Sequence, residues 1–351
     1  MDSAGEFPTR APTTIFIHNM KTGGATLRRI LGRQYDPNAV LTITGEYHRA
    51  AELEPRIARV DREHSQVVQG HIPFGVHELL PSRGVYITLL RHPIDRILSL
   101  YEYRIDQRRR EVFRGDEPLT LAEYITDVQL KELDNGQTRR LSGLDPDFGH
   151  CSAEMLQDAR KNLRERFLVV GITEKFDHSL LLLGRELGWR NLLYFRLNVT
   201  KNKEEKGHVS KDIIDLITTH NALDLELYDS AQQAFEERLG QLGAEFEEQV
   251  RVFKRVNAEY ARFDVYASKR RERTPLRGTG PAYTALSWEE QLRAAVFEEH
   301  PQLLVRQLEL NVEIRRLQRQ QELLRMQVEQ GRKREASLTK ELREARTTTF
   351  C

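Results

Sequence analysis

The sequence predicts an α/β protein, with a parallel sheet flanked by helices and followed by a C-terminal coiled-coil helix. Short runs of β-branched and aromatic residues alternate with helical patterns through the first two-thirds of the 351 residues. These runs are almost continuously apolar, as in parallel strands buried on both faces. A heptad pattern then occupies the region from Leu303 to Ala345.

Four apolar runs predict the strands, and helical patterns separate and follow them. The predicted strands are 14–18, 66–70, 85–90 and 167–172. The predicted helices of this part are 26–34, 94–104 and 176–187. Alternation of this kind places ligand sites at the carboxyl ends of the strands.

A purely helical pattern runs from Leu223 to Phe263, and one apolar stripe follows it. The stripe consists of Tyr228, Ala231, Phe235, Leu239, Leu242, Phe246, Val250 and Phe253. Its spacing of three or four residues predicts a face that packs on the sheet rather than a cofactor site.

The C-terminal part predicts a linker and then a coiled coil. Residues 269–286 are rich in Pro, Gly and Thr, which is typical of a linker. A 3-4-3-4 spacing then picks out Leu303, Gln307, Leu310, Ile314, Leu317, Gln321, Leu324, Val328, Gly331, Glu335, Leu338, Leu342 and Ala345. Nine of these thirteen are apolar, which favours a homo-oligomer formed through 303–345 over a single docked helix. The expected organisation is a flexible N-terminus (1–12), an α/β domain (13–268), a linker (269–286) and a coil (287–346).

Composition limits the classes of partner. The 54 Lys and Arg residues nearly balance 53 Asp and Glu residues, so the formal charge of +1 predicts neither nucleic acid nor an acidic membrane as a partner. Cys151 and Cys351 are the two cysteines, and neither has metal-site spacing, so we expect no metal. The N-terminus lacks a signal-peptide core and no segment approaches a bilayer span, so we expect a cytoplasmic protein.

The segment from Lys21 to Thr26 reads KTGGAT and joins the first strand to a helix. Backbone N–H groups in such a glycine loop bind anions, and Lys21 adds a positive charge, as in P-loop-like proteins. In a nucleotide triphosphatase loop the glycine precedes the lysine, whereas here Lys21 precedes Gly23 and Gly24. The loop therefore predicts a phosphate site of another kind.

A second basic motif follows the strand at 85–90. Arg91 leaves the strand, Pro93 begins a helix, and Ser99 lies about two turns further along. This spacing can bring a guanidinium and a hydroxyl onto one phosphate. Arg96, in the same motif, is either a further ligand or a structural ion-pair partner.

The two motifs together resemble the nucleotide sites of sulfotransferases that use 3′-phosphoadenosine 5′-phosphosulfate (PAPS). The first is similar to their 5′-phosphosulfate loop, although Met20 and Ala25 stand where family members often carry Pro and a hydroxyl residue. The second is similar to their 3′-phosphate motif. The resemblance implies PAPS as co-substrate, bound by Lys21, Thr22, Gly23, Gly24, Ala25, Thr26, Arg91 and Ser99.

His71, in the stretch QGHIPFG, follows a predicted strand, where a histidine can remove a proton from an acceptor hydroxyl at neutral pH. The stretch resembles heparan sulfate and uronyl 2-O-sulfotransferases, in which this histidine is the catalytic base. Their second histidine, two places earlier, is replaced here by Gln69, so we expect His71 to act alone.

Segments 134–143, 167–189 and 195–206 extend the resemblance to family 2 sulfotransferases, above all to soluble bacterial-type members, over residues 13–265. It implies that Asn198, Thr200, Lys201 and Lys203 lie near the nucleotide. It leaves open whether Asn135, Gln137, Thr138 and Arg139 bind the acceptor or brace the site.

The resulting hypothesis is in-line transfer of a sulfuryl group from PAPS to an acceptor hydroxyl of a carbohydrate, either a glycan or a glycoconjugate. His71 would take the acceptor proton, while Lys21 would stabilise charge on the leaving phosphate. The alternatives are a P-loop-type kinase or other NTP-using enzyme and a catalytically inactive coiled-coil scaffold. The basic run at 104–110 either attracts an acidic glycan or is a solvated helix face.

Overall fold

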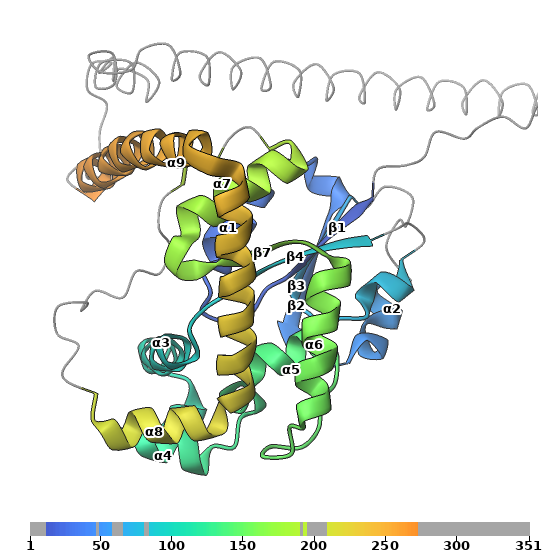
Figure 1. Ribbon diagram of the computed structural model, residues 1–351. Helices are drawn as coiled ribbons and strands as arrows, with labels where there is room; N and C mark the ends of the chain where they lie inside the picture. Colours follow the sequence, from blue (N-terminus) through green and yellow to red (C-terminus); the bar gives the residue numbers. More distant parts are fainter. Residues whose placement is uncertain are drawn as a thin grey trace, which may run out of the picture. The chain divides into compact units, whose positions relative to one another are not determined.

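A computed structural model describes residues 12–46, 49–57, 66–80, 84–189, 192–194 and 209–272, with side chains up to residue 258. Its centre is a five-stranded, fully parallel sheet with the strand order β2-β3-β1-β4-β7 (Figure 1). The strands are β1 (Thr13–Ile17), β2 (Val40–Glu46), β3 (Val67–His71), β4 (Gly84–Leu90) and β7 (Phe167–Ile172). A separate hairpin pairs β5 (Phe113–Arg114) with β6 (Glu117–Pro118).

The sequence predicted four of the five sheet strands, and β2 is the one it missed. β2 lies at an edge of the sheet, so only one neighbour pairs with it. Ile43 is buried, whereas Thr42 and Thr44 beside it are exposed. Its alternating exposure means that β2 lacks the continuous apolar run by which the other four strands, including β7 at the opposite edge, were found.

Nine α-helices lie within the described residues. They are α1 (Gly24–Leu31), α2 (Glu54–Ile57), α3 (Pro93–Asp106), α4 (Leu121–Asp127), α5 (Gly136–Ser142), α6 (Ala153–Arg166), α7 (Phe176–Leu187), α8 (Lys211–His220) and α9 (Ala222–Glu272). The helices predicted at 26–34, 94–104 and 176–187 are confirmed as α1, α3 and α7.

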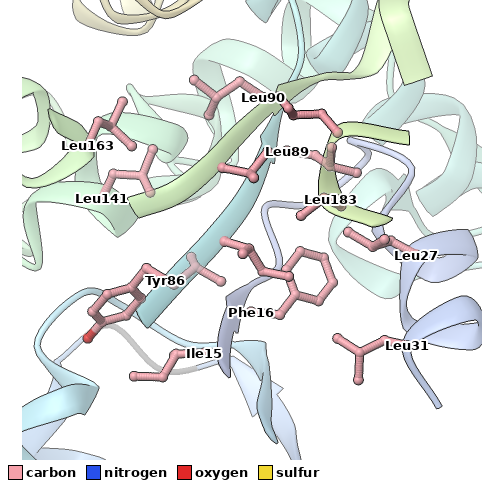
Figure 2. Close-up of a cluster of buried hydrophobic side chains, with 14 of the residues drawn as sticks. Ile15, Phe16, Leu27, Leu31, Tyr86, Leu89, Leu90, Leu141, Leu163 and Leu183 are labelled. Carbon is pink, nitrogen blue, oxygen red and sulfur yellow. The ribbon is translucent and has the colours of Figure 1, made fainter. Parts of the chain in front are cut away.

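The sheet is covered on both faces. Figure 2 shows Leu27 of α1 and Leu183 of α7 on one side of the strands, and Leu141 of α5 and Leu163 of α6 on the other. These side chains are nearly fully buried, and each such leucine stabilises the fold by about 1.5–3 kcal/mol. Two-sided packing fixes the carboxyl ends of the strands, where the loops of interest begin.

The apolar stripe predicted along 223–263 is confirmed as a packing face. Its members on α9 join the main core, fully buried or, for Leu242 and Phe253, partly buried. Gly243 interrupts the helical backbone with φ 69° and ψ −166°, a conformation that only glycine adopts without strain. The helix therefore bends between its two packed halves.

The N-termini of α5 and α9 cap each other, an arrangement we call the cap pair. Oδ1 of Asn135 accepts hydrogen bonds from the backbone N–H groups of Leu223 and Asp224, at 2.9 and 3.1 Å. In return, the Asp224 carboxylate accepts from the N–H groups of Gln137 and Thr138, at 3.1 and 2.7 Å. The first N–H groups of a helix have no acceptor within that helix, and here a side chain from the other helix of the pair accepts them.

Residues 269–272, expected to open the linker, are instead the end of α9. The rest of the predicted linker and the whole predicted coil, 287–346, lie outside the described residues, as does nearly all of 1–12. The chain divides into two compact units, Met1–Asp264 and Val265–Cys351. No described helix combines the length and apolar character that crossing a membrane requires.

Candidate active site

The loop between β1 and α1 has a backbone suited to binding an anion. Lys21 and Gly23 both adopt left-handed conformations, with φ of 62° and 80°. Alternation of this kind turns successive N–H groups toward one concavity. Oγ1 of Thr22 donates to the carbonyl of Asn19 at 2.8 Å, and Oγ1 of Thr173 donates to the carbonyl of Thr22 at 2.8 Å. The side-chain hydroxyl of Thr22 therefore holds the loop in shape.

Helix α1 begins immediately after this turn. The amides of Gly24 and Ala25 lie in its first turn, where N–H groups have no intrahelical acceptor. The N–H of Thr26 bonds to the carbonyl of Gly23 at 3.1 Å. A Cβ atom on Gly24 would lie 2.0 Å from Cδ2 of His18, so this position requires glycine.

Lys21 is partly withdrawn from water. Its Nζ lies 4.2 Å from the centroid of the Tyr103 ring. Burial, and next the positive charge of Arg91, lower the pKa of Lys21 from its ordinary value. A bound anion would offset both effects, so the environment of Lys21 suits a phosphate ligand.

Arg91 joins the two predicted phosphate motifs. Its Nη1 donates to the carbonyl of Lys21 at 3.0 Å. The Gln137 amide holds the backbone of Arg91 on both sides, because Oε1 accepts from its N–H at 3.1 Å and Nε2 donates to its carbonyl at 3.0 Å. Ser99 lies on α3 and is only 8% exposed. The structure thus brings the glycine loop and the motif at 91–99 together.

Several other residues of the predicted site have internal partners. Arg96 is fully buried and forms ion pairs with Glu132 at 2.8 Å and Asp224 at 3.4 Å, which favours its structural interpretation. Asn135 and Thr138 belong to the cap pair. The Arg139 guanidinium contacts the Asp134 carboxylate and donates to the carbonyl of Asp147 at 3.0 Å. These contacts support bracing as the role of segment 134–143.

His71 ends β3, and the structure places a second histidine beside it. The rings of His18 and His71 stack with their centroids 4.3 Å apart. Nδ1 of His71 lies 2.8 Å from the backbone carbonyl of His18. Whether His71 acts alone stays a prediction, but a histidine that the sequence analysis did not single out lies beside it. The missed signal is that His18 directly follows β1, the parallel neighbour of β3.

The end of β7 supplies two residues that the sequence did not single out. The Thr173 hydroxyl lies 2.8 Å from the carbonyl oxygens of both Leu90 and Thr22, so its single hydrogen is shared between the two acceptors. The Glu174 carboxylate accepts from the N–H of His92 at 3.0 Å and from the Tyr228 hydroxyl at 3.0 Å. Both side chains fix the strand ends around the site.

Four predicted nucleotide ligands, Asn198, Thr200, Lys201 and Lys203, lie outside the described residues. Within the described part of the chain, no cluster of three or more His, Cys, Asp or Glu side chains has a metal-binding arrangement.

The basic run at 104–110 divides into buried and exposed parts. Arg104 is buried and ion-paired with Glu111. Arg108, Arg109 and Arg110 are exposed, and the Arg108 guanidinium carbon lies 5.9 Å from the centroid of the Phe113 ring. Part of the run is thus structural, and the remainder lies on the surface.

Curated proteins similar to this chain are carbohydrate sulfotransferases. Galactose-3-O-sulfotransferase 3 of Bos taurus is 28% identical over 257 residues, which cover 66% of this chain and 58% of that protein. Galactosylceramide sulfotransferase of Homo sapiens is 26% identical over 274 residues, covering 69% and 61% of the two chains. The chain thus matches somewhat less than two-thirds of the length of these relatives. A crystal structure of a sulfotransferase from Alicyclobacillus acidocaldarius has a TM-score of 0.37 and 14% identity, covering 65% of this chain and 99% of that one, a likeness too loose to bear on function.

The expected cytoplasmic location is wrong. It rested on the lack of an apolar segment, whereas the homologous galactose-3-O-sulfotransferases and galactosylceramide sulfotransferase are Golgi membrane-type enzymes.

A family profile decides between the sulfotransferase branches. The profile described as galactose-3-O-sulfotransferase matches residues 5–277, well over half of the chain. This confirms the sulfotransferase class predicted from the phosphate motifs, but it does not confirm the finer resemblance to family 2 and the heparan sulfate and uronyl 2-O-sulfotransferases. The chain belongs to the galactose-3-O-sulfotransferase family.

Proposed function

We propose that this protein transfers a sulfuryl group from PAPS to a hydroxyl of a galactose-bearing glycan or glycolipid. The observation that carries the proposal is the hydrogen bond between Arg91 and the carbonyl of Lys21, which joins two anion-binding motifs in one site. The printed names of the relatives, galactose-3-O-sulfotransferase and galactosylceramide sulfotransferase, support galactose as the acceptor sugar.

The residues present fit a nucleotide with phosphates at two positions. Lys21 and the amides of Gly24 and Ala25 suit the 5′-phosphosulfate, because a lysine and the N–H groups of a helix's first turn both bind anions. Arg91 and Ser99 would hold the 3′-phosphate and so select PAPS over ATP. By the resemblance alone, Asn198, Thr200 and Lys201 would complete the nucleotide site.

PAPS supplies an activated sulfuryl group, and the protein supplies a base and a positive charge. In the proposal His71 accepts the proton of the acceptor hydroxyl. Lys21 stabilises the negative charge that develops on the leaving phosphate, where preorganised donors favour the transition state most. None of these roles calls on a metal ion.

Two assays on the full chain test the proposal. Labelled PAPS is incubated with a galactose-terminated oligosaccharide, with galactosylceramide and with a uronic-acid polysaccharide, the acceptor class of the 2-O branch. We expect label on the galactose-bearing acceptors. Label on the uronic-acid polymer alone would move the acceptor to the 2-O branch.

Calorimetry with 3′-phosphoadenosine 5′-phosphate addresses the donor. We expect binding by the wild type and by Lys161→Ala, an exposed control on α6, and strongly reduced binding by Lys21→Ala. Binding of ATP with Mg²⁺ in place of the bisphosphate would favour the NTP-using alternative. Binding of neither nucleotide would favour the inactive scaffold.

A further inference from the structure

The His18 and His71 rings meet because their strands are parallel neighbours. Ile17 of β1 pairs with Gly70 of β3, so the next residue on each strand emerges at the same edge. The ring planes lie within 26° of parallel, with the centroids 4.3 Å apart. The ring of Phe16 stacks on His18 at 5.5 Å. His18 therefore has aromatic contacts with both a core residue and the candidate base.

Helix α1 restricts His18 further. A Cβ atom on Gly24 would lie 2.0 Å from Cδ2 and 2.2 Å from Nε2 of His18. The first residue of the helix thus packs directly against the edge of the imidazole. Because His18 is only 7% exposed, its ring has little room to leave this position.

The contact between the two residues also fixes a tautomer. A carbonyl oxygen can only accept a hydrogen bond, so the 2.8 Å contact between His18 O and His71 Nδ1 places a hydrogen on Nδ1. In a neutral ring the lone pair then belongs to Nε2 of His71. That nitrogen is the one able to take a proton.

The surroundings keep His18 uncharged. Burial lowers its pKa well below the ordinary value, and repulsion by His71 when that ring is protonated, and by Arg28, Arg140 and Lys21, lowers it further. Its Nδ1 is buried without a hydrogen-bond partner among the described residues.

The nearby carboxylate is already paired with other groups. Burial alone would raise the pKa of Glu132, but Arg140 and Arg96, and to a smaller extent His71, lower it. Its carboxylate forms ion pairs with Arg96 at 2.8 Å and Arg140 at 2.9 Å. Positive groups on α1, α5 and the glycine loop thus lie near the histidine pair, and Glu132 is already ion-paired with two arginines.

We propose that His18 is a positioning residue for His71, holding the base by stacking and fixing its tautomer through the backbone carbonyl. This inference rests on the proposed function. As the acceptor oxygen bonds to sulfur and the bond from sulfur to the leaving phosphate oxygen breaks, the hydroxyl proton passes to Nε2 of His71. The imidazolium then releases this proton to solvent, which restores the base.

Two substitutions separate stacking from the other contributions of His18. His18→Ala removes the ring but keeps the carbonyl, whereas His18→Phe keeps a stacking ring that cannot titrate. We expect His18→Ala to lower kcat about 10- to 100-fold, the scale of a slightly misplaced catalytic group, and His18→Phe to recover most of that loss. Both variants should bind 3′-phosphoadenosine 5′-phosphate as the wild type does, as should the exposed control His150→Ala.

The pH profile of kcat/KM distinguishes positioning from general destabilisation. We expect its acid limb to move in His18→Ala, where water reaches His71, and to stay near the wild-type position in His18→Phe. A variant that is only less stable would show a lower kcat/KM at every pH, with the acid limb of the profile at its wild-type position. Nitrogen-15 NMR of the His71 ring should show the Nδ1–H tautomer in the wild type at neutral pH.

The inference would be overturned if His18→Ala kept the wild-type kcat and the wild-type acid limb. It would also be overturned if NMR showed the Nε2–H tautomer of His71 in the wild type. Either result would leave the proposed function standing. A wild type that binds no bisphosphate nucleotide and sulfates no acceptor would overturn the proposed function and this inference together.

Discussion

At the scale of single residues, the site depends on two cations, Lys21 and Arg91, that lie close together and form no ion pair with any described residue. Lys21 and Arg91 are linked by one hydrogen bond, and burial lowers the pKa of each. Two partly buried positive charges side by side are unfavourable until an anion binds between them. We therefore expect the affinity for the nucleotide to fall when either Lys21 or Arg91 is removed.

Arg91→Ala should weaken the binding of 3′-phosphoadenosine 5′-phosphate by about 1.5–3 kcal/mol, the worth of a hydrogen bond to a charged group. Calorimetry measures this change. The control is Arg164→Ala, an exposed arginine on α6. Equal affinities in the two variants would exclude Arg91 as a phosphate ligand.

His71→Ala should lower kcat by about 10²–10⁴, the usual contribution of a general base. Its affinity for the bisphosphate nucleotide should stay close to that of the wild type, because Lys21 and Arg91 remain. Steady-state kinetics and calorimetry on the same preparation provide the two readings. Full turnover in this variant would remove His71 from the mechanism.

His18 should also make the fold sensitive to acid. Below a pH of about 6.5 the unfolded chain takes up a proton at His18 that the folded chain refuses, because burial lowers the folded pKa. The free energy of unfolding should therefore fall as the pH falls from about 6.5 toward the folded pKa, by up to about 1.4 kcal/mol per pH unit.

Urea unfolding between pH 5 and 8 measures how the free energy of unfolding changes with pH. His18→Phe should reduce this slope by the contribution of one proton, because phenylalanine does not titrate. Some slope should persist in the variant, since burial also lowers the pKa of His77. Equal slopes in wild type and variant would show that His18 is not a source of the acid sensitivity.

At the scale of elements, the cap pair ties α5 to α9 and, through Gln137, to Arg91. Asp224 is fully buried and serves two backbone N–H groups as well as Arg96. The site is therefore held by a helix that begins more than 120 residues after Arg91 in the sequence.

Asp224→Asn should destabilise the protein by about 3–5 kcal/mol, because it leaves part of the buried Arg96 charge uncompensated. For a domain of this size that corresponds to a drop in Tm of roughly 10 °C. Calorimetric unfolding measures it against Asp229→Asn, an exposed aspartate on the same helix. Similar Tm values in the two variants would contradict the stabilising role of the cap pair.

The sequence predicted the elements with strong local patterns and missed those that depend on distant neighbours. Strands β1, β3, β4 and β7 and helices α1, α3 and α7 were predicted because their apolar patterns are local. Strand β2 was missed because exposed threonines alternate with a buried isoleucine and give a mixed pattern. The partnership of His18 with His71 and of Asn135 with Asp224 follows from strand order and helix packing, which local spacing does not encode.

At the scale of the whole molecule, the predicted coil at 303–345 stays a prediction, as does the oligomer it would form. A chain ending at residue 286 should be a monomer, whereas the full chain should show a higher mass by light scattering, because the heptad pattern is the proposed interface. The shortened chain should retain nucleotide binding, since Lys21, Arg91 and Ser99 lie before the cut. Equal masses for both chains would dismiss the coil as an oligomer interface.

The contact between Gly24 and the ring of His18 also has an evolutionary consequence. A side chain at position 24 and an imidazole at position 18 cannot occupy the same space. Among related sequences, those that carry serine or alanine at the equivalent of position 24 should therefore carry a different side chain, smaller or directed elsewhere, at the equivalent of position 18. The two positions should covary even though one belongs to a phosphate loop and the other to a strand end.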